Sequence, residues 1–154
     1  MPLSITMQNL VVLVLLFKEL TSRIKMPSQI DILKDFKKQL LNFIDELISQ
    51  FPLEGDLVIL RVFIDNQVET KTVMDGFIYK INTNDNQLRN MISQRNEMFF
   101  IEHDVFTVGN VNPDKVRHFK KLWLSGSLDN DDKTIIWEWI DLFVHLSNQY
   151  IKLN

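Results

Sequence analysis

The sequence predicts an all-α fold, a compact bundle of about five or six helices in one domain. Apolar residues recur at steps of three and four along most of the chain, which is the period of a helix with one buried face. Glycine and proline are scarce, with four of each in 154 residues, unlike a turn-rich β-sandwich. The chain contains no cysteine, and its length and 45% hydrophobic content are enough to bury a core without disulfides.

The clearest helix is expected over residues 131–152. Apolar and polar residues form two interleaved stripes, the first holding Ile136, Trp139, Phe143, Leu146 and Tyr150 and the second holding Glu138, Asp141, His145, Asn148 and Lys152. Residues 129–132 (Asp-Asn-Asp-Asp) offer capping side chains and negative charge at its start. Trp137 lies about 200° from Trp139 around such a helix. We therefore expect Trp137 at a boundary or in contact with a second element.

Residues 1–25 are predicted to be an apolar extension of a single helical domain at 26–154. No charge occurs before Lys18, and residues 10–17 are an unbroken apolar run. That run is shorter than the roughly 20 residues that span a bilayer, and the extension lacks the features of a secretory signal. We expect a buried or partner-facing helix, with a membrane anchor as the less favoured alternative. Because Met26-Pro27 repeats Met1-Pro2, a non-native extension with translation from Met26 is a third alternative.

Residues 28–51 are predicted to form the second clear helix. Ser28 and Asp31 have the spacing of a capping box, and Pro52 follows the last apolar residue of the pattern. The apolar stripe holds Leu33, Phe36, Leu40, Phe43, Leu47 and Phe51. The opposite side carries Asp31, Lys34, Asp35, Lys37 and Lys38, which we interpret as a solvated face of mixed sign.

Residues 57–64 fit either a short buried strand or a helix. Their β-branched residues favour a strand. The helical surroundings, and Arg61 four residues before Asp65, favour a helix, which we predict. Helical spacing returns over residues 68–81 and continues over 88–99, with a turn expected at 83–86.

A basic helix is predicted over residues 113–124, with Pro113 in its first turn and Gly126 just past its end. Its charged residues are Lys115, Arg117, Lys120 and Lys121 against Asp114. Residues 129–141 hold five acids against one lysine, so the two segments can neutralise each other within the fold. A helix-turn-helix that reads DNA places its recognising side chains on its second helix, which is acidic here. Nucleic-acid contact through residues 113–124 is therefore the alternative, not the preferred, interpretation.

Catalytic and metal-binding motifs are absent from the sequence. It has no glycine-rich phosphate loop and no His-Glu-x-x-His. Glu102-His103-Asp104 is the tightest cluster of histidine and carboxylates, but adjacent residues point to different faces of a helix. The acidic turn that starts at Asp129 lacks the glycine and the glutamate of a calcium loop. We therefore expect no cofactor, no metal and no enzymatic activity.

An ordered set of short motifs resembles a family of small helical proteins encoded by nucleocytoplasmic large (giant) DNA viruses. The motifs are residues 36–40 (Phe-Lys-Lys-Gln-Leu), 43–47 (Phe-Ile-Asp-Glu-Leu), 51–52 (Phe-Pro), 95–100 (Arg-Asn-Glu-x-Phe-Phe), 118–123 (His-Phe-Lys-Lys-Leu-Trp) and 132–139 (Asp-Lys-x-Ile-Ile-Trp-x-Trp). The resemblance covers about residues 26–153. It implies a viral protein made in an infected eukaryotic cell, in its cytoplasm or in the virion, and it supplies no catalytic residues.

These observations predict a non-enzymatic protein–protein interaction or structural module whose partner is a viral or host protein. The alternative is a regulator that contacts viral nucleic acid through residues 113–124. A net charge of −3 argues against coating of nucleic acid or anionic lipid by the whole chain. The candidate partner-binding surface is Arg117, Lys120, Lys121, Trp123 and Trp137, since cations beside large aromatic residues are enriched where partners bind. Either tryptophan would serve equally well in the core.

Overall fold

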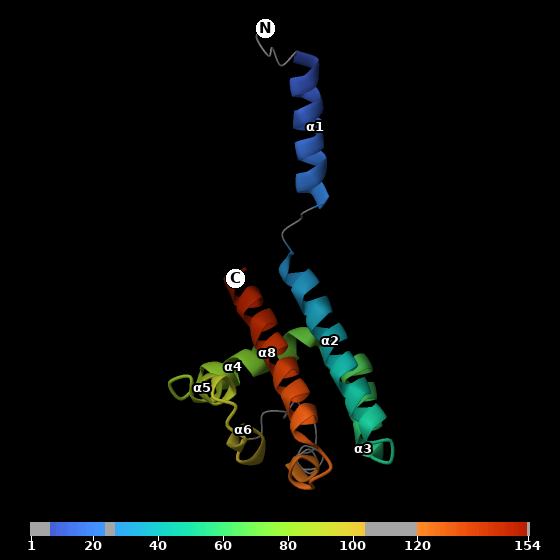
Figure 1. The fold of residues 1–154 in the computed structure, drawn as a ribbon, viewed down its shortest axis with the longest axis vertical. Helices are drawn as coiled ribbons and strands as arrows, with labels where there is room; N and C mark the ends of the chain where they lie inside the picture. Colours follow the sequence, from blue (N-terminus) through green and yellow to red (C-terminus); the bar gives the residue numbers. More distant parts are fainter. Residues whose placement is uncertain (1–6, 24–26, 104–119, 154) are drawn as a thin grey trace.

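The computed structural model describes residues 7–23, 27–103 and 120–153 (Figure 1). Seven helices have defined bounds there: α1 (Met7–Arg23), α2 (Gln29–Gln50), α3 (Gly55–Asn66), α4 (Thr70–Asn82), α5 (Gln87–Ser93), α6 (Met98–Ile101) and α8 (Asn130–Lys152). Residues 120–124 are also helical, and these three ranges contain no strand. The predicted all-α class is confirmed. The helices outnumber the expected five or six because α1 precedes the bundle and because the segment expected at 88–99 forms two short helices.

The two long helices, α2 and α8, lie side by side at the centre of the bundle (Figure 1). Aromatic rings fill the space between them. The Phe143 ring on α8 lies 5.6 Å from the Phe36 ring and 5.8 Å from the Phe43 ring, between centroids, and Trp139 stacks on Phe43 at 5.7 Å. Ring pairs at such separations contribute about 0.5–1.5 kcal/mol each beyond burial. The predicted apolar stripes of the two helices are therefore the faces that meet.

Both long helices begin with a capping box at the residues proposed for their starts. Ser28 Oγ accepts a hydrogen bond from the Asp31 N–H at 3.2 Å, and the Asp31 carboxylate accepts one from the Ser28 N–H at 3.0 Å. Asp129 and Asp132 make the same reciprocal pair of bonds, at 2.8 and 3.1 Å. These bonds satisfy N–H groups that the first turn of a helix leaves without partners. Each helix therefore starts at a fixed residue, which fixes the side chains that face the core.

The ambiguous segment 57–64 is helical and lies within α3, as predicted. This helix packs along α2 and buries Leu57 and Ile64. Arg61 lies 3.9 Å from Asp65, the predicted partner four residues on. Its shorter contact is with Asp45 on α2, whose carboxylate accepts a hydrogen bond from Arg61 Nε. Contacts with α2 therefore select a helix over the strand that the β-branched residues alone would favour.

Left-handed residues set the boundaries of the short helices. The turn between α4 and α5 holds three consecutive residues with positive φ, Asn84, Asp85 and Asn86, and these residue types tolerate that conformation best after glycine. Arg95, with φ of 53°, separates α5 from α6. It donates two hydrogen bonds to the Asp141 carboxylate on α8, including Nη1 to Oδ1 at 2.8 Å. The sequence pattern gave no sign of this break because Arg95 has no turn preference of its own.

Helix α1 stands apart from the bundle (Figure 1). No other described helix packs along it. Its large apolar side chains, from Leu10 to Phe17 and at Leu20, are 47–67% exposed. A helix therefore forms in the extension, and the bundle described here does not bury it.

Candidate functional site

The residues predicted to form a partner-binding surface lie in different environments. Lys121 is exposed and Lys120 is half-buried, both in the helical residues 120–124. Trp123 and Trp137 are 2% and 5% exposed and belong to the core. Arg117, with most of the predicted basic helix, lies outside the described residues. The two tryptophans are therefore not available as an exposed contact for a partner.

A cluster of four aromatic rings accounts for the burial of the two tryptophans. Phe99 and Phe100 on α6 contact each other edge to face at 5.0 Å. The Phe100 ring lies 4.1 Å from that of Trp123 and 4.8 Å from that of Trp137, between centroids. Trp137 thus reaches a second element, one of the two outcomes expected from its angle to Trp139. This cluster attaches α6 and residues 120–124 to the start of α8.

Two cations lie over the tryptophans of this cluster. The Arg95 guanidinium carbon is 5.5 Å from the Trp137 centroid, and Lys133 Nζ is 5.0 Å from the Trp123 centroid. Lys133 also forms an ion pair with Glu97 at 3.1 Å. Cations in this position are attracted by the negative face of the ring. Arg95 and Lys133 therefore interact with partners inside the fold.

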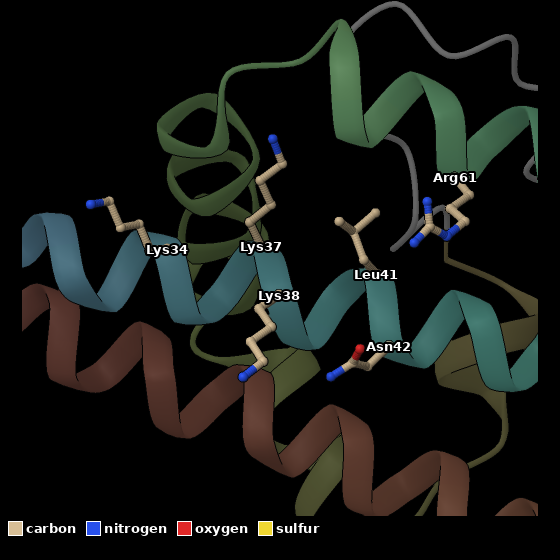
Figure 2. Close-up of a pocket in the computed structure, with 6 residues that line it drawn as sticks. All are labelled: Lys34, Lys37, Lys38, Leu41, Asn42 and Arg61. Carbon is tan, nitrogen blue, oxygen red and sulfur yellow. The ribbon is translucent and has the colours of Figure 1, made fainter.

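A basic pocket of about 320 Å³ lies on the surface between α2 and α3. We call it the basic pocket, and it is lined by Lys34, Lys37, Lys38, Leu41, Asn42 and Arg61. Figure 2 shows Lys37 and Leu41 on the upper edge of α2, Lys38 and Asn42 on its lower edge, and Arg61 on the neighbouring α3. Residues 34, 37, 38 and 41 follow steps of three and four, which places their side chains on one side of a helix. Four cations, one aliphatic side chain and one amide therefore line the same pocket.

The four cations of the basic pocket are only partly neutralised. Arg61 pairs with Asp45, and the hydrogen bond to that carboxylate is the main reason that the pKa of Arg61 is raised. Lys37 lies 3.7 Å from the Asp65 carboxylate and donates a hydrogen bond to the Asp65 carbonyl oxygen at 2.8 Å. No described residue forms an ion pair with either of the remaining two lysines. The basic pocket and its two adjacent carboxylates thus carry a net charge of about +2 at neutral pH.

The basic pocket is not predicted by the sequence. Asp31 and Asp35 alternate with the lysines on the polar side of α2, and this pattern predicts a solvated face of mixed sign. The structure adds Arg61 from another helix and leaves Asp31 engaged with Ser28 in the capping box. The signal that was available is the spacing of Lys34 and Lys38, four residues apart on the same side.

A second pocket of about 450 Å³ lies where α4 meets the end of α8. It is lined by Asp75, Ile78, Tyr79, Asn82, Thr83, Tyr150 and Ile151. Its single carboxylate, Asp75, forms an ion pair with Lys71 at 2.7 Å. The lining contains no histidine and no second carboxylate, so it holds no acid–base pair.

The described residues include no group of three or more side chains placed to hold a metal ion. His103 is half-buried, and Asp104 of the Glu102-His103-Asp104 cluster lies outside the described residues. Asp141, four residues before His145 on α8, accepts two hydrogen bonds from Arg95.

The fold and site together define an all-α bundle with a basic surface pocket. Comparisons with family models, with curated proteins and with solved structures gave no match to this chain. None of the described helices is both long and apolar enough to cross a membrane.

Proposed function

We propose that this protein is a non-enzymatic protein–protein interaction module that binds an acidic segment of a partner protein in the basic pocket. The observation that carries the proposal is that four cations from α2 and α3 line one pocket, and that Lys34 and Lys38 form no ion pair with a described residue. The viral setting, with a viral or host partner in the infected cell or the virion, rests on the family resemblance of residues 26–153.

The chemistry of the basic pocket suits a peptide that alternates acidic and aliphatic residues. Lys34 and Lys38 can pair with carboxylates, Leu41 offers apolar contact, and the Asn42 amide can both donate and accept hydrogen bonds. Lysine side chains also present aliphatic stems to a bound chain while the charge stays in water. Both α2 and α3 pack into the bundle, so the cations are held on rigid elements.

A nucleic acid is the weaker fit for the same pocket. Tight binding to nucleic acid normally uses several cations along a groove that follows the strand. Here the four cations line one pocket of about 320 Å³ between two helices, not an extended groove.

The test compares two charge reversals of equal size on the full chain. Lys34→Glu/Lys38→Glu changes the basic pocket, and Lys120→Glu/Lys121→Glu changes the described part of the predicted basic helix. Two fluorescein-labelled probes of equal formal charge are titrated at physiological salt and followed by anisotropy. One probe is a peptide of alternating glutamate and leucine, and the other is a thymidine oligonucleotide.

Preferential binding of the peptide, reduced about tenfold or more by Lys34→Glu/Lys38→Glu and little by the other reversal, supports the proposal. In pull-downs from infected cells with nuclease present, wild type and Lys120→Glu/Lys121→Glu should then recover the same stoichiometric protein. Lys34→Glu/Lys38→Glu should not recover it. Preferential binding of the oligonucleotide, lost in Lys120→Glu/Lys121→Glu, would reject the pocket and favour nucleic-acid contact through residues 113–124.

A further inference from the structure

Residues 10–17 of helix α1 present apolar side chains in every direction around the helix. Leu10 to Phe17 are eight consecutive large apolar residues, and each is 47–67% exposed. At 3.6 residues per turn, eight positions pass around the helix more than twice. An amphipathic helix that docks on a protein surface needs only one apolar stripe, about 100° wide. The surface that covers α1 must therefore enclose it from several sides.

The described part of the bundle does not supply such an enclosure. No described helix packs along α1, and the described core contains none of its residues. A single helix from a second copy of the chain would cover one side of α1 and leave the others in water. The acyl chains of a membrane are apolar and surround an inserted segment on all sides.

The length of the apolar run limits how deeply it can insert. Eight residues at 1.5 Å each extend for about 12 Å, against a hydrocarbon core of about 30 Å. The run therefore fits within one leaflet. Charged side chains follow the apolar run but do not precede it. Lys18 comes directly after Phe17, and Lys18, Arg23 and Lys25 outweigh the single acid, Glu19. This net positive flank matches the anionic headgroups that line cytoplasmic membrane surfaces.

We propose that α1 inserts into one leaflet of an anionic membrane, with residues 10–17 among the acyl chains and Lys18 at the headgroup level. The insertion would leave the bundle in water and attached to the membrane through residues 24–28. It is independent of the basic pocket, so the failure of one proposal leaves the other standing.

The experiment is flotation of the full chain with vesicles of phosphatidylcholine alone or mixed with phosphatidylserine. The altered chain is Leu13→Gln/Leu16→Gln, and the matched control makes the same two changes on exposed leucines of the bundle, Leu53→Gln/Leu124→Gln. Each leucine withdrawn from the acyl region should lower the partition constant roughly tenfold. Lys18→Gln should lower binding about fivefold on the phosphatidylserine vesicles and leave it unchanged on phosphatidylcholine.

Flotation of wild type and control but not of Leu13→Gln/Leu16→Gln supports the proposal. Flotation unaffected by that double substitution, or absent with both vesicle types, overturns it. The proposal is also overturned if the wild type does not float, forms a defined oligomer without lipid, and becomes a monomer in Leu13→Gln/Leu16→Gln. In that case a second copy of the chain covers α1. Circular dichroism of each variant verifies that the bundle is folded.

Discussion

Replacement of Trp123 by alanine should lower the free energy of unfolding by about 4 kcal/mol. The indole is 2% exposed and lies against the Phe100 ring at 4.1 Å between centroids. Truncation of a buried tryptophan to alanine costs about 3–5 kcal/mol, and the loss of ring contacts adds to the cavity term. A total stability of about 5–15 kcal/mol is normal for a domain, so this one change would remove a large part of it.

The Trp123→Phe variant distinguishes the contribution of the aromatic ring to stability from that of the indole N–H group. Nε1 of Trp123 is buried, and no described residue accepts a hydrogen bond from it. A buried donor without a partner costs about 1–3 kcal/mol, and phenylalanine removes that cost. Phenylalanine also leaves a cavity of about 40 Å³, which costs about 1 kcal/mol at 24 cal/mol per Å³. The opposing effects should keep Trp123→Phe within about 1 kcal/mol of wild type.

The assay is urea unfolding followed by far-ultraviolet circular dichroism, which reports helix content in every variant. Leu124→Ala serves as the control, because this neighbouring side chain is 64% exposed and its truncation should change stability by no more than about 0.5 kcal/mol. If Trp123→Ala costs as little as Leu124→Ala, the indole does not lie in the core. The arrangement of α6, residues 120–124 and α8 would then be refuted.

Three further predictions concern α8. Trp139→Phe keeps the ring contacts but removes the 2.8 Å hydrogen bond from Nε1 to Glu46, and should cost about 1 kcal/mol; a double-mutant cycle with Glu46→Ala measures the coupling, and additive losses would contradict it. Asp129→Ala should cost about 1 kcal/mol and Asp129→Ser much less, since serine can also cap a helix; equal losses by urea unfolding would exclude the cap. The pKa of Asp132 is held below its ordinary value of 3.8 by the Asp129 backbone N–H and then by the Gln50 side chain. Its stabilising charge is present above pH 3.8 and lost as the pH falls through the lowered pKa, so acid unfolding curves should show wild type losing more stability below about pH 4 than Asp132→Asn.

Most of the fold could be predicted because its helices carry local signals. The capping boxes of α2 and α8 are visible as Ser28 with Asp31 and Asp129 with Asp132, and the apolar stripes between them have the helical period. The end of α5 could not be predicted in the same way. Arg95 adopts a left-handed conformation and bonds to Asp141, 46 residues further along the chain. A break produced by so distant a contact leaves no trace in local spacing.

The candidate site was largely hidden from sequence reasoning for a related reason. Lys34 and Lys38 were visible as charges, but their importance depends on Arg61, which α3 brings to the same place. Trp123 and Trp137 were equally visible as aromatic residues near cations. Whether such residues form a core or a contact surface depends on Phe100, which lies between them in space but not in sequence.

The position of α8 in the chain affects how the protein folds during its synthesis. The apolar stripe of α2, with Phe36 and Phe43, packs on Phe143 of α8. Roughly 80 residues separate the end of α2 from the start of α8, and a ribosome needs on the order of 4–16 s to make them at about 5–20 residues per second. The nascent chain therefore carries Phe36 and Phe43 without their α8 contacts for seconds. During that interval it is a substrate for chaperones that hold unfolded chains, and a message truncated before residue 130 would yield a protein that cannot close its core.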